Sequence, residues 1–304
     1  MKIAYLICAH RNPQLIKKTI ECLAGGENSF FVHIDAKFAI EPFQFLRGDR
    51  VYFLKKRLPV YWGEFSQTEA ILQLIREALE APQSYDYFVL LGGSEFPLRS
   101  GNYIHKFLED RQGTEFITLM KMPAPGKPLA RINTLRFPST RPVLRFIFRV
   151  LAKAGLAQRD YRKHIGPLEP YSGNTWWALS RAACQYIIDF DRCDRRLANF
   201  LANTHASDEC YFHTILGNSP LKSQIRRHLL YEEWPSEGPC HHPNLLSAKH
   251  VDFFESHEEV PAQDLHGPGE MLFARKFSDD HLDLVERIAA IIARKENLPK
   301  QSVR

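Results

Sequence analysis

The chain has no run of about 18 uninterrupted apolar residues, the length that a membrane-spanning helix needs. Its first apolar run ends at His10 and Arg11, and no small-residue cleavage site follows. This pattern predicts a first buried strand rather than a signal peptide. We therefore expect a cytoplasmic protein.

The sequence also lacks the cysteine spacings of zinc sites, because none of its six cysteines forms a Cys-x-x-Cys pair. Without an export signal, we expect reduced and mostly buried thiols rather than disulfides. The adjacent His241 and His242 have no partner at metal-ligand spacing. We therefore expect neither a metal ion nor a cofactor.

Acidic residues are nearly absent between residues 121 and 164, where eleven Lys or Arg accompany one acid, Asp160. This segment carries a net charge of +10, so the rest of the +5 chain carries −5. Residues 141–151 have the pattern of a basic amphipathic helix. Such a helix is typical of a peripheral contact with an anionic membrane, or of a helix packed on the sheet. We expect no nucleic-acid partner.

Strand and helix patterns alternate through the first 120 residues. Continuous apolar runs predict strands at 2–8, 29–35, 51–54, 85–91 and 116–119, and apolar residues at helical spacing predict helices at 14–23, 66–79 and 102–108. The second half predicts helices at 181–190, 208–216 and 280–294, a strand at 228–231, and long loops around a helix between 121 and 170. The βαβ rhythm predicts an α/β fold with a Rossmann-type, mostly parallel sheet and helices on both faces.

Polar side chains follow three of the expected strands. They are His10, Arg11, His33, Asp35, Lys37, Ser94 and Glu95. Because ligands of such folds bind beyond the C-terminal ends of the strands, we expect these side chains to line one crevice.

Glu209 is the acid of the second half with the most informative neighbours. Ser207 predicts the N-cap of the helix at 208–216, which places Glu209 in its first turn. An acid in that position has a structural use, because it complements the helix macrodipole. The same position fixes the carboxylate in direction and keeps it ionised, as a general base requires.

Two late cations, Arg275 and Lys276, lie between Phe273 and Phe277. The phenylalanines would anchor the cations beside an anionic ligand such as a diphosphate, or the cations are simply exposed on a strand edge.

Three tryptophans, Trp176, Trp177 and Trp234, could stack on sugar rings of an acceptor or belong to the core. On a strand, Trp176 and Trp177 would point to opposite faces, so that one is buried while the other faces the crevice.

Short motifs in a fixed order span nearly the whole chain. They are AYLICAH at 4–10, FVHIDAK at 31–37, YWG at 61–63, LGGSEFPL at 91–98, YSGNTWW at 171–177, SDE at 207–209 and FARKF at 273–277. This set resembles the core-2/I-branching β-1,6-N-acetylglucosaminyltransferase family (glycosyltransferase family 14), which also contains peptide O-xylosyltransferases. The chain has no luminal stem, anchor or disulfide pattern of the animal members, so we expect a bacterial member. A membrane contact through 141–151 would then be at the inner face of the bacterial membrane.

The resemblance implies a GT-A-like fold, a UDP-sugar donor, inversion at the anomeric carbon and no metal requirement. It implies that Glu209 is the catalytic base and that Lys276 binds the diphosphate. The early His and the His-x-Asp-x-Lys strand end would lie near the nucleotide. The second diphosphate-binding cation of the family does not align, and Arg275 and Arg227 are candidates to replace it.

We therefore expect a single domain over 1–304, with a nucleotide-binding half at 1–120 and an acceptor-binding and catalytic half at 121–304. The expected reaction moves a sugar, N-acetylglucosamine or xylose, from a UDP-sugar to a hydroxyl of a glycan, with bacterial polysaccharide and lipid-linked glycans as candidate acceptors.

Two alternatives stay open. One is a metal-dependent GT-A transferase that uses Glu95 or Asp35, since Asp189-Phe190-Asp191 closes a helix and should face solvent. The other is a non-catalytic protein that binds a polyanion or a membrane.

Overall fold

The computed structural model describes residues 1–235, 242–264 and 267–297 of the 304-residue chain. Its main sheet has seven strands in the order β10-β6-β9-β4-β1-β2-β3. The strands are β1 (Ile3–Ala9), β2 (Ser29–Ile34), β3 (Val51–Phe53), β4 (Tyr87–Gly92), β6 (Glu115–Phe116), β9 (Ala178–Ser180) and β10 (Ile225–Arg226). Only β9 runs antiparallel to its neighbours in this sheet.

The central strands β1, β2 and β4 are buried along almost their whole length. Such strands carry no alternation of polar and apolar side chains, because helices cover both faces of a parallel sheet. In the register of the sheet, Cys8 of β1 lies opposite His33 of β2 and Gly92 of β4. The polar residues that follow these three strands therefore meet at one edge of the sheet.

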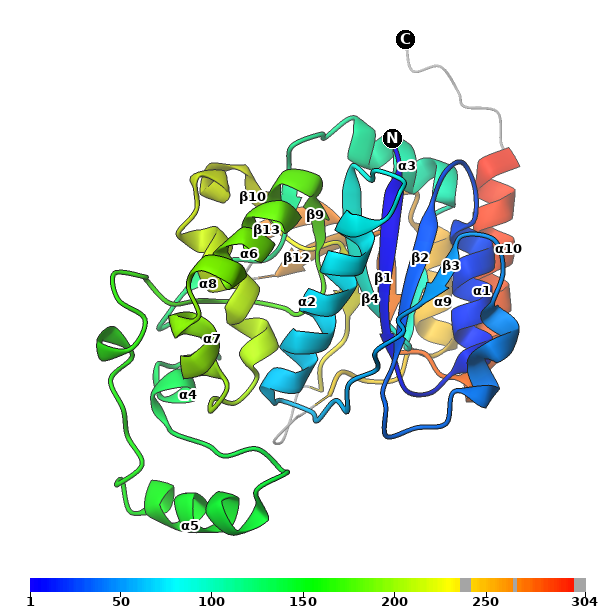
Figure 1. Cartoon of the computed structure of the whole chain (residues 1–304). Helices are drawn as coiled ribbons and strands as arrows, with labels where there is room; N and C mark the ends of the chain where they lie inside the picture. Colours follow the sequence, from blue (N-terminus) through cyan, green and yellow to red (C-terminus); the bar gives the residue numbers. More distant parts are fainter. Residues whose placement is uncertain (236–241, 265–266, 298–304) are drawn as a thin grey trace.

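Helices cover both faces of this sheet (Figure 1). The longer helices of the described chain are α1 (Pro13–Leu23), α2 (Phe65–Glu80), α3 (Gly101–Glu109), α5 (Pro142–Lys153), α6 (Arg181–Cys193), α9 (Ala248–Ser256) and α10 (Leu282–Asn297), of which α5 lies apart from this sheet. Ile71 of α2 and Ile187 of α6 belong to one core cluster, and Ile16 of α1 and Ile104 of α3 belong to the cluster on the other face. The prediction of an α/β fold with a mostly parallel sheet between helical layers is confirmed.

A second sheet, in the order β11-β14-β5, lies beside the carboxyl end of β4. Its strands are β11 (Leu230–Glu232), β14 (Phe273–Arg275) and β5 (Glu95–Pro97). Arg275 pairs in register with Glu95 on one side and with Glu232 on the other. This sheet therefore brings a segment from the end of the chain to the turn after β4.

The remaining elements are short. They are α4 (Ala130–Asn133), α7 (Arg196–Leu201), α8 (Tyr211–Gly217), the pairs β7 (Met120–Lys121) with β8 (Tyr171–Ser172) and β12 (Pro261–Asp264) with β13 (Gly267–Glu270), and the 3-10 helices η1 (Glu41–Leu46), η2 (Tyr161–Lys163), η3 (Ser207–Glu209), η4 (Pro220–Gln224) and η5 (Asp279–His281). Within the described ranges, no helix is both long and apolar enough to span a membrane.

Two expectations about side chains need correction or qualification. Asp191 is buried and pairs with Arg76 at 2.5 Å and with Arg195, so it does not face solvent as expected, whereas the side chain of Asp189 is 45% exposed. Five cysteines are free thiols, of which Cys193 is exposed, and the sixth, Cys240, lies outside the described residues together with His241.

Candidate active site

A cleft of about 520 Å³ opens at the carboxyl ends of β1, β2 and β4. Its lining includes twelve of the thirteen residues expected in the site: His10, Arg11, His33, Asp35, Lys37, Ser94, Glu95, Trp176, Glu209, Trp234, Arg275 and Lys276. These residues come from segments far apart in the chain. The mostly parallel sheet explains the first seven, and the second sheet brings in Arg275 and Lys276.

Trp177 is the expected residue that does not line the cleft. Its side chain is buried in the core, 2% exposed, and packs against Phe212. Its indole therefore cannot stack on a ligand, and its assignment to an acceptor site is wrong. Trp176, the preceding residue, faces the cleft, because neighbouring side chains of extended backbone point to opposite sides.

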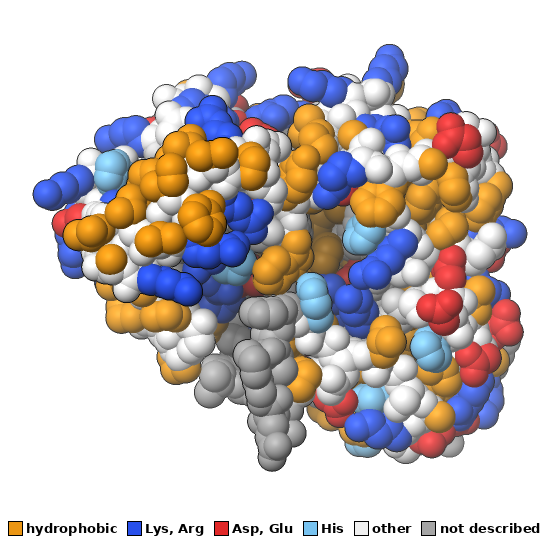
Figure 2. Space-filling model, turned by 90° about the horizontal axis from the view of Figure 1, so that it is seen from below, with side chains coloured by type: hydrophobic (Ala, Val, Ile, Leu, Met, Phe, Trp, Pro, Cys, Tyr) orange, Lys and Arg blue, Asp and Glu red, His pale blue; other side chains and the backbone are white. Residues whose placement is uncertain are grey.

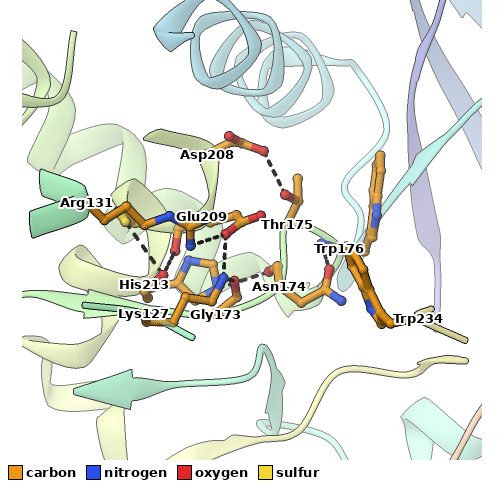
Figure 3. Close-up of polar contacts among 12 residues, drawn as sticks. Lys127, Arg131, Gly173, Asn174, Thr175, Trp176, Asp208, Glu209, His213 and Trp234 are labelled. Carbon is orange, nitrogen blue, oxygen red and sulfur yellow. Dashed lines mark hydrogen bonds and ion pairs between the residues drawn. The ribbon is translucent and has the colours of Figure 1, made fainter. Parts of the chain in front are cut away.

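Glu209 lies at the cleft with its side chain 26% exposed. Lys127 and Arg131 both donate to its Oε2 atom, the latter at 2.6 Å (Figure 3). Its backbone carbonyl accepts bonds from Gly173 N at 3.0 Å and from Ser172 Oγ at 2.9 Å. Two cations and a fixed backbone thus hold this carboxylate in one direction.

Glu209 does not sit at the N-terminus of an α-helix as expected. Residues 207–209 form η3, and the α-helix that follows, α8, begins at Tyr211. Ser207 does not cap it, because its buried hydroxyl lies 3.2 Å from Thr68 Oγ1. The direction of the Glu209 side chain is therefore set by Lys127 and Arg131 rather than by a helix terminus.

Asp208, the neighbour of Glu209, is buried and accepts a bond from Thr175 Oγ1 at 2.7 Å. Burial, and then the charge of Glu209, raise the pKa of Asp208 to about 6. The two adjacent acids therefore differ in environment, and the partly exposed Glu209 is the one that faces the cleft.

Arg275 is held among acids and an aromatic ring. Its Nε atom lies 3.2 Å from Glu95 Oε1, and its Nη1 atom lies 4.0 Å from Glu232 Oε1. Its guanidinium lies 4.8 Å from the centre of the Trp176 ring. Burial raises the pKa of Glu232, chiefly opposed by Arg275. Arg275 thus compensates buried carboxylates, which leaves less of its charge for a ligand.

Lys276 differs from Arg275 in that no carboxylate of the described chain lies within 4.0 Å of its ammonium group. Burial, followed by the charges of Arg11 and Arg275, lowers the pKa of Lys276. Arg11 also lines the cleft. A cluster of cations with this surplus of positive charge attracts an anionic ligand group.

At the β2 end, the polar residues shape a neighbouring loop. His33 Nε2 accepts a bond from Leu58 N at 2.9 Å, and burial lowers the pKa of His33 to about 4. Asp35 Oδ1 accepts bonds from the backbone of Lys37 at 3.0 Å and of Val60 at 3.2 Å. These two side chains therefore form the wall of the cleft at this end.

The two carboxylates of the metal-dependent alternative are engaged within the protein. Glu95 Oε2 accepts from Gly92 N at 2.5 Å and from Ser94 N at 3.3 Å, and Asp35 also pairs with Lys37 at 3.3 Å. In the part of the chain that the structure describes, no three His, Cys, Asp or Glu side chains come together as a metal-ligand group.

Several residues at the site were not expected from the sequence. Lys127 and Arg131 belong to the basic segment 121–164. The sequence shows the surplus charge of this segment, but it does not predict that these two cations lie at Glu209. Glu232 accepts bonds from Asn174 at 3.0 Å and from Trp234 Nε1 at 2.8 Å. The bonds from Lys127 and Arg131 to Glu209 and from Asn174 to Glu232 join residues at least 58 positions apart, so local sequence carries no signal for them. The bond between Trp234 and Glu232 is the exception, because these residues are two positions apart.

The expected substitute Arg227 is not part of this cation cluster. It is buried, donates to the carbonyl of Gly267, and does not line the cleft. Arg11 is the additional cation that does.

A parallel α/β sheet with an acid and a cation cluster at its carboxyl edge defines an enzyme-like site for an anionic ligand such as a nucleotide. The model of the Core-2/I-Branching enzyme family matches residues 3–254, and the chain belongs to this family. The resemblance noted from the motifs is thereby confirmed, and membership indicates a glycosyltransferase.

Curated relatives include three xylosyltransferases. Xylosyltransferase 2 of Rattus norvegicus is 23% identical over 295 residues, which cover 91% of this chain and 32% of the relative. Xylosyltransferase 1 of Homo sapiens is 23% identical over 248 residues, which cover 79% of this chain and 25% of the relative. Xylosyltransferase oxt of Drosophila melanogaster is 22% identical over 291 residues, which cover 91% of this chain and 32% of the relative. The chain thus spans about a third or less of the length of these relatives.

Proposed function

We propose that this protein is an inverting, metal-independent glycosyltransferase that moves a sugar from a UDP-sugar to a hydroxyl of a glycan. The observation that carries the proposal is one cleft, in a chain of the Core-2/I-Branching enzyme family, that collects Glu209 and Lys276. Both halves of the chain contribute to this cleft, which supports a single working unit over 1–304.

In this proposal Glu209 takes the proton of the acceptor hydroxyl while the hydroxyl oxygen attacks the anomeric carbon. The bond between that carbon and the diphosphate oxygen breaks, and UDP leaves with the bonding electron pair. One displacement inverts the anomeric centre. Lys127 and Arg131 fix the direction of the Glu209 carboxylate, which keeps its free oxygen aimed at the acceptor.

Lys276 and Arg11 would stabilise the charge that grows on the leaving diphosphate. Preorganised cations act strongly on developing charge, because no reorganisation is needed during the reaction. Arg275 keeps the acidic side chains Glu95 and Glu232 neutralised beside this group. Side-chain cations would thus do the work that a divalent metal does in other nucleotide-sugar transferases.

We infer xylose or N-acetylglucosamine as the transferred sugar. The names of the relatives support xylose, and the family description supports a branching reaction on a glycan. Trp176 and Trp234, which line the cleft, would contact the sugar rings.

A screen of nucleotide sugars for slow hydrolysis tests this proposal. We expect release of UDP from UDP-xylose or UDP-N-acetylglucosamine, no release from the GDP- or CDP-linked sugars used as controls, and an unchanged rate in excess EDTA. Loss of the rate in EDTA with recovery on adding Mn²⁺ would establish the metal-dependent alternative. A protein that binds UDP without turning over any UDP-sugar, even with glycan acceptors, would be a binding protein.

A further inference from the structure

Helix α5 is the one long helix of the described chain without a buried side chain. Figure 1 shows it at the end of the molecule away from the main sheet, so the expectation of a helix packed on the sheet is wrong. It is attached through its inner side, where Phe148 contacts Phe137 with ring centres 4.6 Å apart. Arg145 adds an ion pair with Glu64 at 3.8 Å.

The outer side of α5 is apolar. Val143, Phe146, Ile147 and Val150 follow the spacing that places residues on one helix face, and they are 70%, 67%, 44% and 52% exposed. Figure 2 shows a continuous hydrophobic patch on the lobe that carries them. Water contact with so many large apolar groups is unfavourable, so this surface has the character of an interaction site.

Cations border this apolar row. Arg141, Arg145, Arg149 and Lys153 repeat at intervals of four residues, which places them along one side of the helix. Basic side chains adjoin the patch in Figure 2. An amphipathic helix with an apolar face and a row of arginines beside it matches an anionic lipid surface, where acyl chains and phosphates are layered in the same order.

A cavity of about 630 Å³ lies between α5 and the body of the protein. Four cations line it, namely Arg136, Arg145, Arg149 and Lys153, and Glu64 is the acid among its lining residues. The cavity shares Trp62 and Gly63 with the reaction cleft. Positive charge thus continues from the helix to the edge of the cleft.

We propose that α5 is a docking helix for anionic lipid bilayers. Val143, Phe146 and Val150 enter the acyl boundary, and the exposed Arg141 and Arg149 contact lipid phosphates. Docking on this face would bring the cleft close to the surface, where an acceptor carried on a lipid is presented. Charge complementarity favours an anionic bilayer over a second copy of the chain as the partner of α5, because two such basic helices would repel each other.

Co-sedimentation with vesicles tests the proposal without requiring sugar transfer, so its outcome is independent of the proposed enzyme activity. The vesicles are phosphatidylcholine alone, or phosphatidylcholine with about one third phosphatidylglycerol. We expect binding to the anionic vesicles at low salt, release as salt rises, and weak binding to the neutral ones.

Two variants separate the apolar and electrostatic contributions. The triple variant Val143→Ser, Phe146→Ser and Val150→Ser should lower partitioning at least tenfold, because it removes the inserted groups. None of these side chains is buried, so the variant should fold. The control Phe45→Ser removes an apolar side chain, 48% exposed, from another surface and should not change binding.

The double variant Arg141→Gln and Arg149→Gln should lower binding to anionic vesicles roughly tenfold or more. Its matched control, Lys55→Gln and Lys56→Gln, removes two exposed charges elsewhere and should have a small effect.

Three results would overturn the proposal. The first is wild-type protein that stays in the supernatant with both vesicles. The second is binding of a soluble polyanion, by the wild type and equally by the serine variant, without any binding of vesicles. This result would indicate a site for an acidic glycan. The third is a dimer in sedimentation velocity that the serine variant makes monomeric, again without vesicle binding.

Discussion

Arg131 Nη1 lies 2.6 Å from Glu209 Oε2, and Lys127 contacts the same oxygen atom. This relationship links the basic segment at 121–164 to the acid proposed as the catalytic base. Part of the unusual charge of that segment therefore lies at the site itself, while Arg145, Arg149 and Lys153 of α5 line the second cavity. The second carboxylate oxygen of Glu209 has no bond among the described contacts and is the atom available to an acceptor.

Glu209→Gln keeps the shape of the side chain and a carbonyl oxygen for Arg131, but removes the basic carboxylate. We expect turnover to fall about 10²-fold or more, because general base catalysis contributes on that order. UDP affinity should stay within about threefold of the wild type, since the diphosphate is proposed to meet other residues. Steady-state rates with saturating acceptor and calorimetric titration with UDP measure both quantities.

Glu169 provides a control, because Glu169→Gln removes an exposed acid that pairs with Lys121 outside the cleft. It should leave turnover unchanged. A Glu209→Gln variant that kept more than half of the wild-type rate would assign the base to another residue.

Lys276→Ala should weaken binding of UDP roughly 10- to 100-fold, because a charge-assisted bond contributes more than a neutral one. Uridine has no diphosphate, so its affinity should change by less than about threefold. Titrations of both ligands give the ratio. Lys249→Ala, which removes an exposed lysine of α9, should leave both affinities unchanged. Equal weakening of UDP and uridine by Lys276→Ala would show that Lys276 acts on the fold and not on the diphosphate.

Asp208→Asn should stabilise the protein at pH 8 and not at pH 4. The pKa of Asp208 is raised from 3.8 to about 6 in the folded state, so the folded protein binds a proton more readily than the unfolded chain does. Its carboxylate therefore costs stability above pH 6, and this cost disappears as the pH falls below the unfolded value. A shift of this size corresponds to on the order of 3 kcal/mol.

Urea unfolding of wild type and Asp208→Asn at several pH values measures this difference. Asp49→Asn, which removes an exposed carboxylate, is the control and should show no comparable gain. Glu209→Gln should weaken the pH dependence that Asp208 causes, since the charge of Glu209 contributes to the raised pKa of Asp208. Equal stability of wild type and Asp208→Asn across this range would mean that Asp208 carries no such cost.

Much of the fold could be predicted because long apolar runs determine it. The buried strands β1, β2 and β4 and the helices α1, α2 and α6 appear in the sequence as continuous or helically spaced apolar residues. The strand β5 could not be predicted in this way. It has three residues, and its conformation depends on pairing with β14, almost 180 residues later in the chain.

Part of the site was also predictable, because the apolar runs that predict the strands also show which residues follow each strand. Residues that follow parallel strands gather at one sheet edge, which brought His10, Asp35 and Ser94 together. The sequence could not reveal that Lys127 would reach Glu209, because that contact depends on how a long irregular segment folds over the cleft. Nor could it decide which of two adjacent tryptophans is buried.

Gly173, in the segment 171–175, lies beside Glu209, to whose backbone carbonyl it is hydrogen-bonded. A Cβ atom added there would lie 1.9 Å from the carbonyl oxygen of Thr118 and 2.6 Å from the ring of His213. The nearest of these atoms is a backbone oxygen, so the backbone itself would have to move. Gly173→Ala should therefore lower the free energy of unfolding by about 1–3 kcal/mol, the usual cost of overpacking.

The same displacement should reduce turnover further, because Gly173 N donates to the carbonyl of Glu209 at 3.0 Å and helps to place it. Gly48→Ala is the matched control, since its Cβ would meet no atom within 4 Å and should change stability by less than about 0.5 kcal/mol. Thermal unfolding and steady-state rates of both variants test this. If Gly173→Ala unfolded at the temperature of Gly48→Ala and kept its rate, the close packing of this segment would not be what positions Glu209.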